Sequence, residues 1–176
     1  MIGDRNQDFM ARAIELSRQG MLAGEGGPFG AVIVRDGEIV AEGNNKVLAT
    51  NDPTNHAEMV ALRRAAEKLK SFDLSGCEIY VNAEPCPMCL GAIYWAQLKK
   101  VRFANTRYDA TEIGFDDALI YDERAKPLEE RRIDVKHVPD PRAREVFDEW
   151  LGMADKGRAE HPGGGQQVPD RVRPAP

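Results

Sequence analysis

The sequence predicts an α/β protein, a three-layer sandwich in which a mixed five-stranded sheet lies between helices. Short apolar runs rich in valine and isoleucine alternate along the chain with longer segments of helical periodicity. With 176 residues, of which 42% are hydrophobic and 30% charged, the chain can bury one sizeable core but scarcely two. These observations favour a single folded domain and exclude a disordered or filamentous chain.

The expected elements follow the order αββαβαβ, then βα. Apolar side chains at three- and four-residue spacing predict a first helix over about residues 5–22, and Asp36-Gly37 predicts a hairpin turn between the next two strands. Thr54 is the expected cap of the second helix, and Pro87 suits the first turn of the third because no backbone donor is needed there. The other boundaries are strands over residues 31–34, 38–44, 77–81, 101–104 and 133–138, and helices over 53–69, 85–98 and 141–153.

The domain is expected to span residues 1–153, followed by a loose C-terminal tail over residues 154–176. From His161 onward the sequence has three glycines and four prolines, but only Val168 and Val172 as large apolar residues. Such a segment contributes little to a core.

Charge and targeting features favour a cytoplasmic protein that does not bind membranes, and they disfavour nucleic acid as a partner. Lys and Arg number 24 against 29 Asp and Glu, so the net charge is −5, which disfavours a broad phosphate-binding face. No apolar run approaches the roughly 20 residues that span a bilayer, and the first ten residues lack the features of a signal peptide. The three cysteines are an odd number in such a chain, which disfavours a disulfide framework. Cys77 opens a strand and is expected to lie in the core.

The other two cysteines, Cys86 and Cys89, have the spacing of a metal site. At positions i and i+3 in the first turn of a helix, both sulfurs can lie on one face and reach the same ion. A helix N-terminus also favours the thiolate form, and two thiolates offset the charge of Zn²⁺. His56 is the expected third ligand, which leaves the fourth position to water. Zinc lowers the pKa of such a water to about 7, so the pattern indicates hydrolysis.

Glu58 is the candidate general acid and base, since it could take a proton from water and return it to the substrate. Residues i and i+2 of a helix point roughly 200° apart, so we expect the ion to lie beyond the helix end, flanked by His56 and Glu58. Taken alone, C-x-x-C can be a redox pair and a single histidine a surface residue. The combination of H-x-E with P-C-x-x-C, however, is the signature of zinc-dependent base deaminases.

The chain resembles the cytidine deaminase-like superfamily and, within it, the bacterial guanine deaminases. The resemblance covers residues 9–150 and rests on residues 26–34, 51–54, 56–58, 84–95 and 113–117. It implies the cytidine deaminase-like fold, one Zn²⁺ per subunit and a homodimer. The zinc segments are shared by deaminases of several bases, so the choice of base depends on the rest of the sequence.

The resemblance also implies the substrate contacts. Phe29 would stack on the flat base, Asn44 would hydrogen-bond a purine edge and the Ala57 backbone would hold the base near the metal; Phe29 could instead fill the core, and Asn44 could belong to a turn. Guanine presents N–H donors at N1 and N2, which a carboxylate in this segment would accept, and Asp117 would also assist Glu58 in proton movement. Asp116 and Asp117 could instead cap a helix near Ala118. Trp95 would line the pocket or the dimer contact.

The activity implied is hydrolytic deamination of guanine to xanthine and ammonia in purine catabolism. The alternatives are a tRNA adenosine deaminase, a deaminase of guanosine, cytosine or another aminated heterocycle, and a non-catalytic zinc-stabilised binding module. Two features depart from the family pattern: no aromatic residue follows Trp150, where relatives can close the site of a partner subunit, and Asn82 stands where relatives have a small hydroxylated residue.

Overall fold

The computed structural model describes residues 5–153. The chain divides into two compact units, Met1–Ala125 and Lys126–Pro176. The predicted tail over residues 154–176 lies outside the described residues. None of the described helices is both long enough and apolar enough to cross a membrane.

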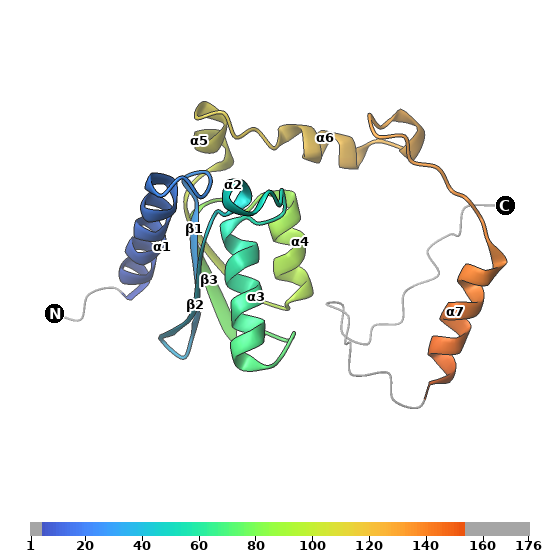
Figure 1. Ribbon diagram of the computed structural model, residues 1–176, viewed down its shortest axis with the longest axis horizontal. Helices are drawn as coiled ribbons and strands as arrows, with labels where there is room; N and C mark the ends of the chain where they lie inside the picture. The colour runs from blue at the N-terminus through green and yellow to red at the C-terminus, as the bar shows by residue number, and fades with distance from the viewer. Residues whose placement is uncertain (1–4, 154–176) are drawn as a thin grey trace. The chain divides into compact units, whose positions relative to one another are not determined.

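The first unit contains a mixed four-stranded sheet in the order β2-β1-β3-β4 (Figure 1). β1 pairs antiparallel with both β2 and β3, and β3 pairs parallel with β4. The hairpin turn falls at Asp36-Gly37, where both residues have positive φ, as two-residue hairpin loops favour. The strands are β1 (Gly30–Arg35), β2 (Glu38–Asn44), β3 (Cys77–Ala83) and β4 (Lys100–Asn105).

Helices cover both faces of this sheet, so the predicted three layers are confirmed (Figure 1). Alternate residues of β1 point to opposite faces: Val32 and Val34 pack with Ala13 of α1, whereas Ala31 and Ile33 pack with the residues of α3 and α4. Cys77 lies in the cluster on the α3 and α4 side of the sheet, so its predicted core position is confirmed. The helices of this unit are α1 (Arg5–Leu22), α2 (Val47–Thr50), α3 (Ala57–Leu69), α4 (Pro87–Trp95), α5 (Arg107–Glu112) and α6 (Ala118–Ala125).

The second unit contains a short 3₁₀ helix, η1 (Leu128–Glu130), and α7 (Pro141–Gly152). Asp140 caps α7 by accepting a hydrogen bond from the Arg142 backbone, and Pro141 occupies the first turn. The predicted closing helix therefore forms, one residue shorter than expected.

The predicted fifth strand over residues 133–138 is wrong. This segment has no regular secondary structure and pairs with no other strand of the described chain. Ile133 is 75% exposed and Val138 is 82% exposed. An alternating apolar pattern fits a strand, but only a neighbouring edge can satisfy its backbone donors and acceptors.

The starts and ends of two helices also differ from expectation. α3 begins after His56 rather than at Thr54, whose backbone and hydroxyl groups both donate to Asp52. Thr54 is thus engaged in a local turn before the helix and is not its cap. α4 ends at Trp95 instead of Leu98, because Gln97 takes a left-handed conformation with φ of 64°.

Candidate metal centre and active-site cavity

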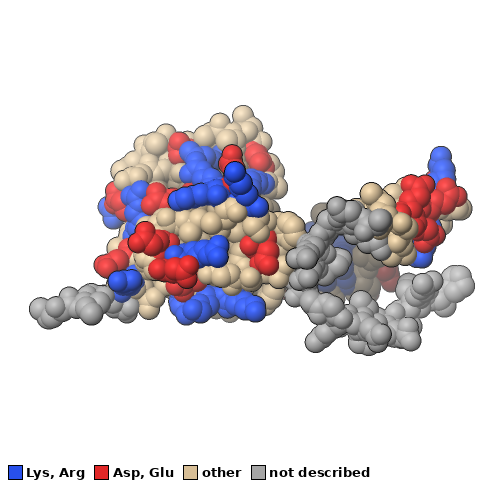
Figure 2. Space-filling model, turned by 90° about the horizontal axis from the view of Figure 1, so that it is seen from below, with Lys and Arg blue, Asp and Glu red and all other residues tan. Residues whose placement is uncertain are grey.

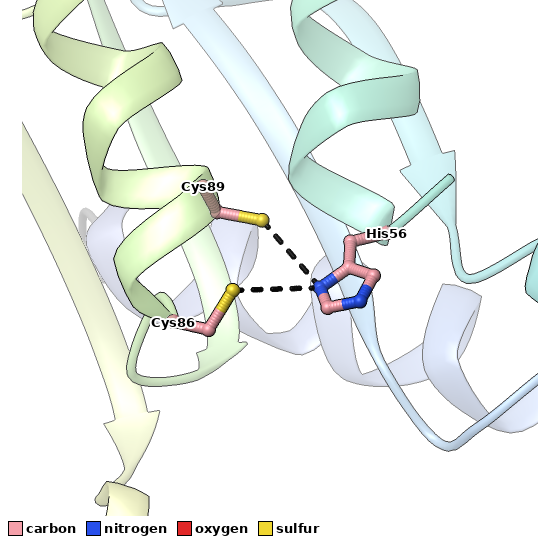
Figure 3. A group of neighbouring side chains, drawn as sticks. All are labelled: His56, Cys86 and Cys89. Atoms are coloured by element: carbon pink, nitrogen blue, oxygen red, sulfur yellow. Dashed lines mark hydrogen bonds between the residues drawn. The ribbon is translucent and has the colours of Figure 1, made fainter. Parts of the chain in front are cut away.

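Two helix starts meet at the candidate metal centre. His56 is the N-cap residue of α3, and Cys86 is the N-cap residue of α4, with Cys89 in the first turn of α4. Neither N-cap side chain makes a capping hydrogen bond, so both side chains are available to the site. In Figure 3 the two sulfurs and the imidazole point toward one another from these helices.

The distances between the three side chains fit a zinc ion. The Sγ atoms of Cys86 and Cys89 each lie 3.6 Å from Nδ1 of His56 (Figure 3). Tetrahedral zinc with bonds of about 2.3 Å to sulfur and 2.0 Å to nitrogen would separate these atoms by about 3.5 Å. The three ligand atoms lie within 4.8 Å of one another. Within residues 5–153, no fourth side chain belongs to this cluster.

The electrostatics of the two thiols also favour a cation. The Cys89 thiol donates to Cys86, which lowers the pKa of Cys86 to about 4, and the same contact raises the pKa of Cys89. The pair by itself therefore holds one negative charge and opposes a second. Two thiolates side by side need a cation between them, and Zn²⁺ supplies it.

Glu58 lies beside this cluster and is 5% exposed. Burial, and to a smaller extent the negative charge at Cys86, raises the pKa of Glu58 to about 7. A carboxyl group with this pKa can both accept and release a proton near neutral pH. The first turn of α3 brings His56 and Glu58 to the same cavity.

The cavity has a volume of about 570 Å³, within the range of small-molecule sites. The loop before β1, the loop between β2 and α3, the start of α4 and the segment from α5 to α6 form its walls. The lining residues are Gly26, Gly27, Phe29, Asn45, Val47, Leu48, Pro53, His56, Glu58, Ala83, Glu84, Cys86, Arg107, Ala110, Gly114, Phe115, Asp116, Asp117 and Ile120.

Phe29 and Asp117 both line the cavity, and Phe29 also packs against the core cluster, so both positions considered for it are seen. Phe29 packs edge-to-face on Phe115, with ring centroids 4.8 Å apart. Asp116 accepts a hydrogen bond from the Ala118 backbone at the start of α6, as a helix cap does. The Asp117 carboxyl is half-buried. Burial and the charge at Cys86 raise the pKa of Asp117.

Three predicted substrate contacts do not line the cavity. Asn44 donates to a Glu25 carboxylate oxygen at 2.6 Å, and this carboxylate also pairs with Lys46 at 2.8 Å. Ala57 is fully buried at the start of α3, and Trp95 is 63% exposed at the far end of α4. Asn44 and Ala57 are therefore engaged within the fold, and Trp95 faces outward.

Sequence reasoning missed several lining residues, among them Asn45, Glu84, Arg107 and Phe115. Asn45 directly follows Asn44, the residue that was predicted as a substrate contact, and it accepts a hydrogen bond from the Val47 backbone at the start of α2. Phe115 lies in the quoted segment 113–117, but no pattern marks it as a partner of Phe29. Arg107 stood in a loop region for which no helix was predicted.

Two glycines allow close approach around the site. A Cβ atom at Gly26 would lie 2.0 Å from Oδ1 of Asn45, and one at Gly43 would lie 2.4 Å from the carbonyl oxygen of Ala57. A side chain at either position would displace Asn45 or the first turn of α3. The small residues therefore fix the spacing between the loops and the metal ligands.

The parallel pair β3 and β4 explains why distant residues meet here. β3 ends at Ala83 and β4 ends at Asn105, and these two residues are register partners. Cys86 follows the first strand and Arg107 follows the second, so both side chains emerge at the same edge of the sheet.

The chain is similar to known deaminases over most of its length. Residues 4–105 match the model of the family "Cytidine and deoxycytidylate deaminase zinc-binding region". Guanine deaminase from Bacillus subtilis is 50% identical over 151 residues, which cover 86% of this chain and 97% of the relative. The crystal structure of that relative matches with a TM-score of 0.83 and covers 85% of this chain and 96% of the other.

Two further relatives match smaller parts. A tRNA-specific adenosine deaminase from Aquifex aeolicus is 46% identical over 77 residues, which cover 44% of this chain and 51% of the relative. A guanine deaminase structure from Nitrosomonas europaea is 36% identical with a TM-score of 0.59 and covers 62% of this chain and 63% of the other. The chain therefore belongs to the family of the cytidine and deoxycytidylate deaminase zinc-binding region, in agreement with the resemblance seen in its sequence.

Proposed function

We propose that this protein hydrolyses guanine to xanthine and ammonia. The observation that carries the proposal is one cavity that combines a zinc-ligand set, a buried carboxyl group and a second carboxylate, in a chain that is 50% identical to a guanine deaminase across 97% of that enzyme. The cavity volume of about 570 Å³ suits a single purine base.

His56, Cys86 and Cys89 would hold one Zn²⁺ per subunit. When bound, the ion would act as a Lewis acid that makes hydroxide available from water near neutral pH. Because the cluster contains three side chains among the described residues, the fourth position is left to that water. The same fact argues against a purely structural zinc site, which normally has four protein ligands.

Glu58 would move the protons of the reaction. Its carboxylate would take one proton from the attacking water and deliver it to the ring nitrogen beside C2. It would then carry the second proton, from the hydroxyl group now on C2, to the departing amino group as the C2–N2 bond breaks and the C2 carbonyl forms. The pKa of about 7 suits both steps because neither protonation state is strongly favoured at neutral pH.

The rest of the cavity would orient the base. Phe29, held by Phe115, would stack on the ring, and Asp117 would accept hydrogen bonds from the donors on N1 and N2 and assist Glu58 in proton movement. For Asn44, the contacts with Glu25 suggest support of the loop, whereas its neighbour Asn45 lies at the cavity wall.

A tRNA adenosine deaminase is the second candidate, since such enzymes match the zinc-binding part of the chain. The net charge of −5 argues against a polyanionic substrate. On the face shown in Figure 2, Lys and Arg side chains are interspersed with Asp and Glu and form no continuous basic surface.

Ammonia release from the zinc-loaded protein tests the proposal. We expect turnover with guanine and little or none with guanosine, adenine, cytosine, cytidine or tRNA. If guanine is inert while another compound on this panel releases ammonia, the substrate is wrong although the chemistry stands. If none does, the binding-module alternative gains support.

We also propose that the protein is a cytoplasmic homodimer. The outer end of α4 exposes Tyr94 and Trp95, each to 63%, and large exposed aromatic side chains are typical of contact surfaces.

A further inference from the structure

Arg107 has no assigned role, although it lines the same cavity as Glu58 and Asp117. Among the described residues of the cavity wall, it supplies the one permanent positive charge. A cation in a substrate cavity of a chain with net charge −5 calls for an explanation.

The position of Arg107 is fixed by its neighbours. Its backbone nitrogen donates to Oε2 of Glu84 at 3.0 Å. Its guanidinium lies 5.1 Å from the ring centroid of Tyr108 and 4.7 Å from that of Tyr121. Such stacking holds the guanidinium plane in place while leaving its edge open to hydrogen bonds.

Most of the donors of this guanidinium remain available to a ligand. Nη2 donates to the Tyr108 hydroxyl at 3.3 Å, and the Tyr121 hydroxyl interacts as well. A guanidinium carries five N–H groups, so these two contacts leave at least two donors for a planar acceptor pair. Among the described residues, Arg107 forms no ion pair with a carboxylate that would engage these remaining donors.

Arg107 also lies close enough to Asp117 to influence it. The positive charge of Arg107 opposes part of the rise that burial causes in the pKa of Asp117. The cavity therefore presents a fixed donor group and an acceptor carboxylate near each other, in the same cavity as the metal ligands His56 and Cys86.

We propose that Arg107 determines specificity by donating hydrogen bonds to the O6 and N7 atoms of guanine, an inference that rests on the proposed function. O6 and N7 form an acceptor pair that matches a guanidinium fork, and N1 and N2 present the donors that a carboxylate accepts. Adenine places an amino donor where guanine has O6, so the guanidinium would face a donor instead of an acceptor. Arg107 and Asp117 together would then select a 6-oxo-2-aminopurine.

Arg107→Met tests this assignment because it keeps the length of the side chain but removes every donor. We expect KM for guanine to rise about 10- to 100-fold, as for loss of a charged hydrogen-bonded contact, with kcat roughly unchanged. Arg107→Lys, which cannot form the two-pronged contact, should fall between the wild type and Arg107→Met. Arg18→Met, at an exposed position of α1 outside the cavity, is the matched control and should not change KM.

Inhibition constants separate recognition of O6 from a merely structural effect. Hypoxanthine carries O6 and N7 without the 2-amino group, whereas 2-aminopurine lacks O6. In Arg107→Met, the inhibition constant of hypoxanthine should rise about as much as KM for guanine, and that of 2-aminopurine should change much less. Zinc content and melting temperature show that the variant is folded and loaded.

The outcomes divide clearly. Equal weakening of both inhibitors, or an unchanged KM, would overturn the assignment while leaving guanine deamination intact. A wild-type protein that releases no ammonia from guanine would instead refute the proposed function, and the assignment with it.

Discussion

At the scale of single residues, the site depends on the contrast between Glu58 and its neighbours. Glu58 is buried and carries a pKa raised to about 7, whereas the helix start and the Cys89 thiol hold Cys86 as a thiolate. The sequence identified these residues because each has a spacing that serves chemistry. It could not identify Asn45, a single polar residue in a loop, or Arg107, at the start of a short helix that no apolar periodicity predicted.

Glu58→Gln should abolish turnover without removing the metal. The amide keeps the size of the side chain but cannot accept and return a proton, so we expect kcat to fall by about 10²- to 10⁴-fold. Zinc content, measured by elemental analysis, should stay at one ion per chain because His56, Cys86 and Cys89 are unchanged. Cys89→Ser is the matched comparison and should lose zinc. Loss of zinc from Glu58→Gln would show that this carboxylate is a ligand and not the proton carrier.

At the scale of helices and strands, the hydrophobic pattern predicted the four strands of the sheet and the helices that cover it. The apolar side chains of each of these elements pack against a neighbouring element, as Val32 does on one face of the sheet and Ile33 on the other. The pattern gave a wrong strand over residues 133–138. Alternating apolar and polar residues indicate the two faces of a strand, but they do not show that a neighbouring strand is present to pair with it. The pattern also failed at Thr54, where a local turn with Asp52 competes with helix capping.

The contact between α1 and β2 predicts a pH-dependent contribution to stability. Arg12 donates to both carboxylate oxygens of Glu42, at 2.7 and 2.8 Å, and these hydrogen bonds lower the pKa of Glu42. Since both side chains are about one-third exposed, we expect Glu42→Gln to lower the free energy of unfolding by only about 0.5–1 kcal/mol at pH 7.

Because the folded-state pKa of Glu42 is depressed, its stabilising effect is present above the unfolded-state pKa and is lost as pH falls through the folded-state pKa. Urea unfolding of the wild type and Glu42→Gln at several pH values should therefore show a gap at neutral pH that closes below about pH 4. A gap that stays constant or widens on acidification would contradict this prediction.

Asn82 should stabilise the start of β1 beside the cavity. Its Oδ1 accepts from the Gly30 backbone at 2.8 Å and its Nδ2 donates to the Pro28 carbonyl at 2.9 Å, so it bridges both neighbours of Phe29. Asn82→Ala leaves these two groups without a partner, and we expect the free energy of unfolding to fall by about 1–3 kcal/mol. Because Phe29 loses support, KM for guanine should rise as well. Asn105→Ala, an exposed control at the end of β4, should change neither quantity.

At the scale of the whole molecule, function arises where segments far apart in the sequence converge. The loop before β1 supplies Phe29, the start of α3 supplies His56 and Glu58, and the ends of the parallel strands β3 and β4 lead to Cys86 and Arg107. Local patterns reveal each contributor separately, but only the sheet order shows that they share one cavity. Contacts between chains would then involve the outward-facing residues of the same elements.

The proposed homodimer makes a testable prediction about these outward-facing residues. Tyr94 and Trp95 lie exposed at the end of α4, and Phe103 of the edge strand β4 is 45% exposed. Burying such side chains in a second copy removes apolar surface from water. Light scattering coupled to size exclusion should give twice the mass of one chain, and a Tyr94→Lys/Trp95→Lys double variant should shift the mass toward the monomer.

Lys99→Glu, a charge change at an exposed position between α4 and β4, tests whether charge alone weakens association. A wild-type protein that elutes as a monomer at micromolar concentration would refute the dimer, and an unaltered dimer in the double variant would move the interface away from α4.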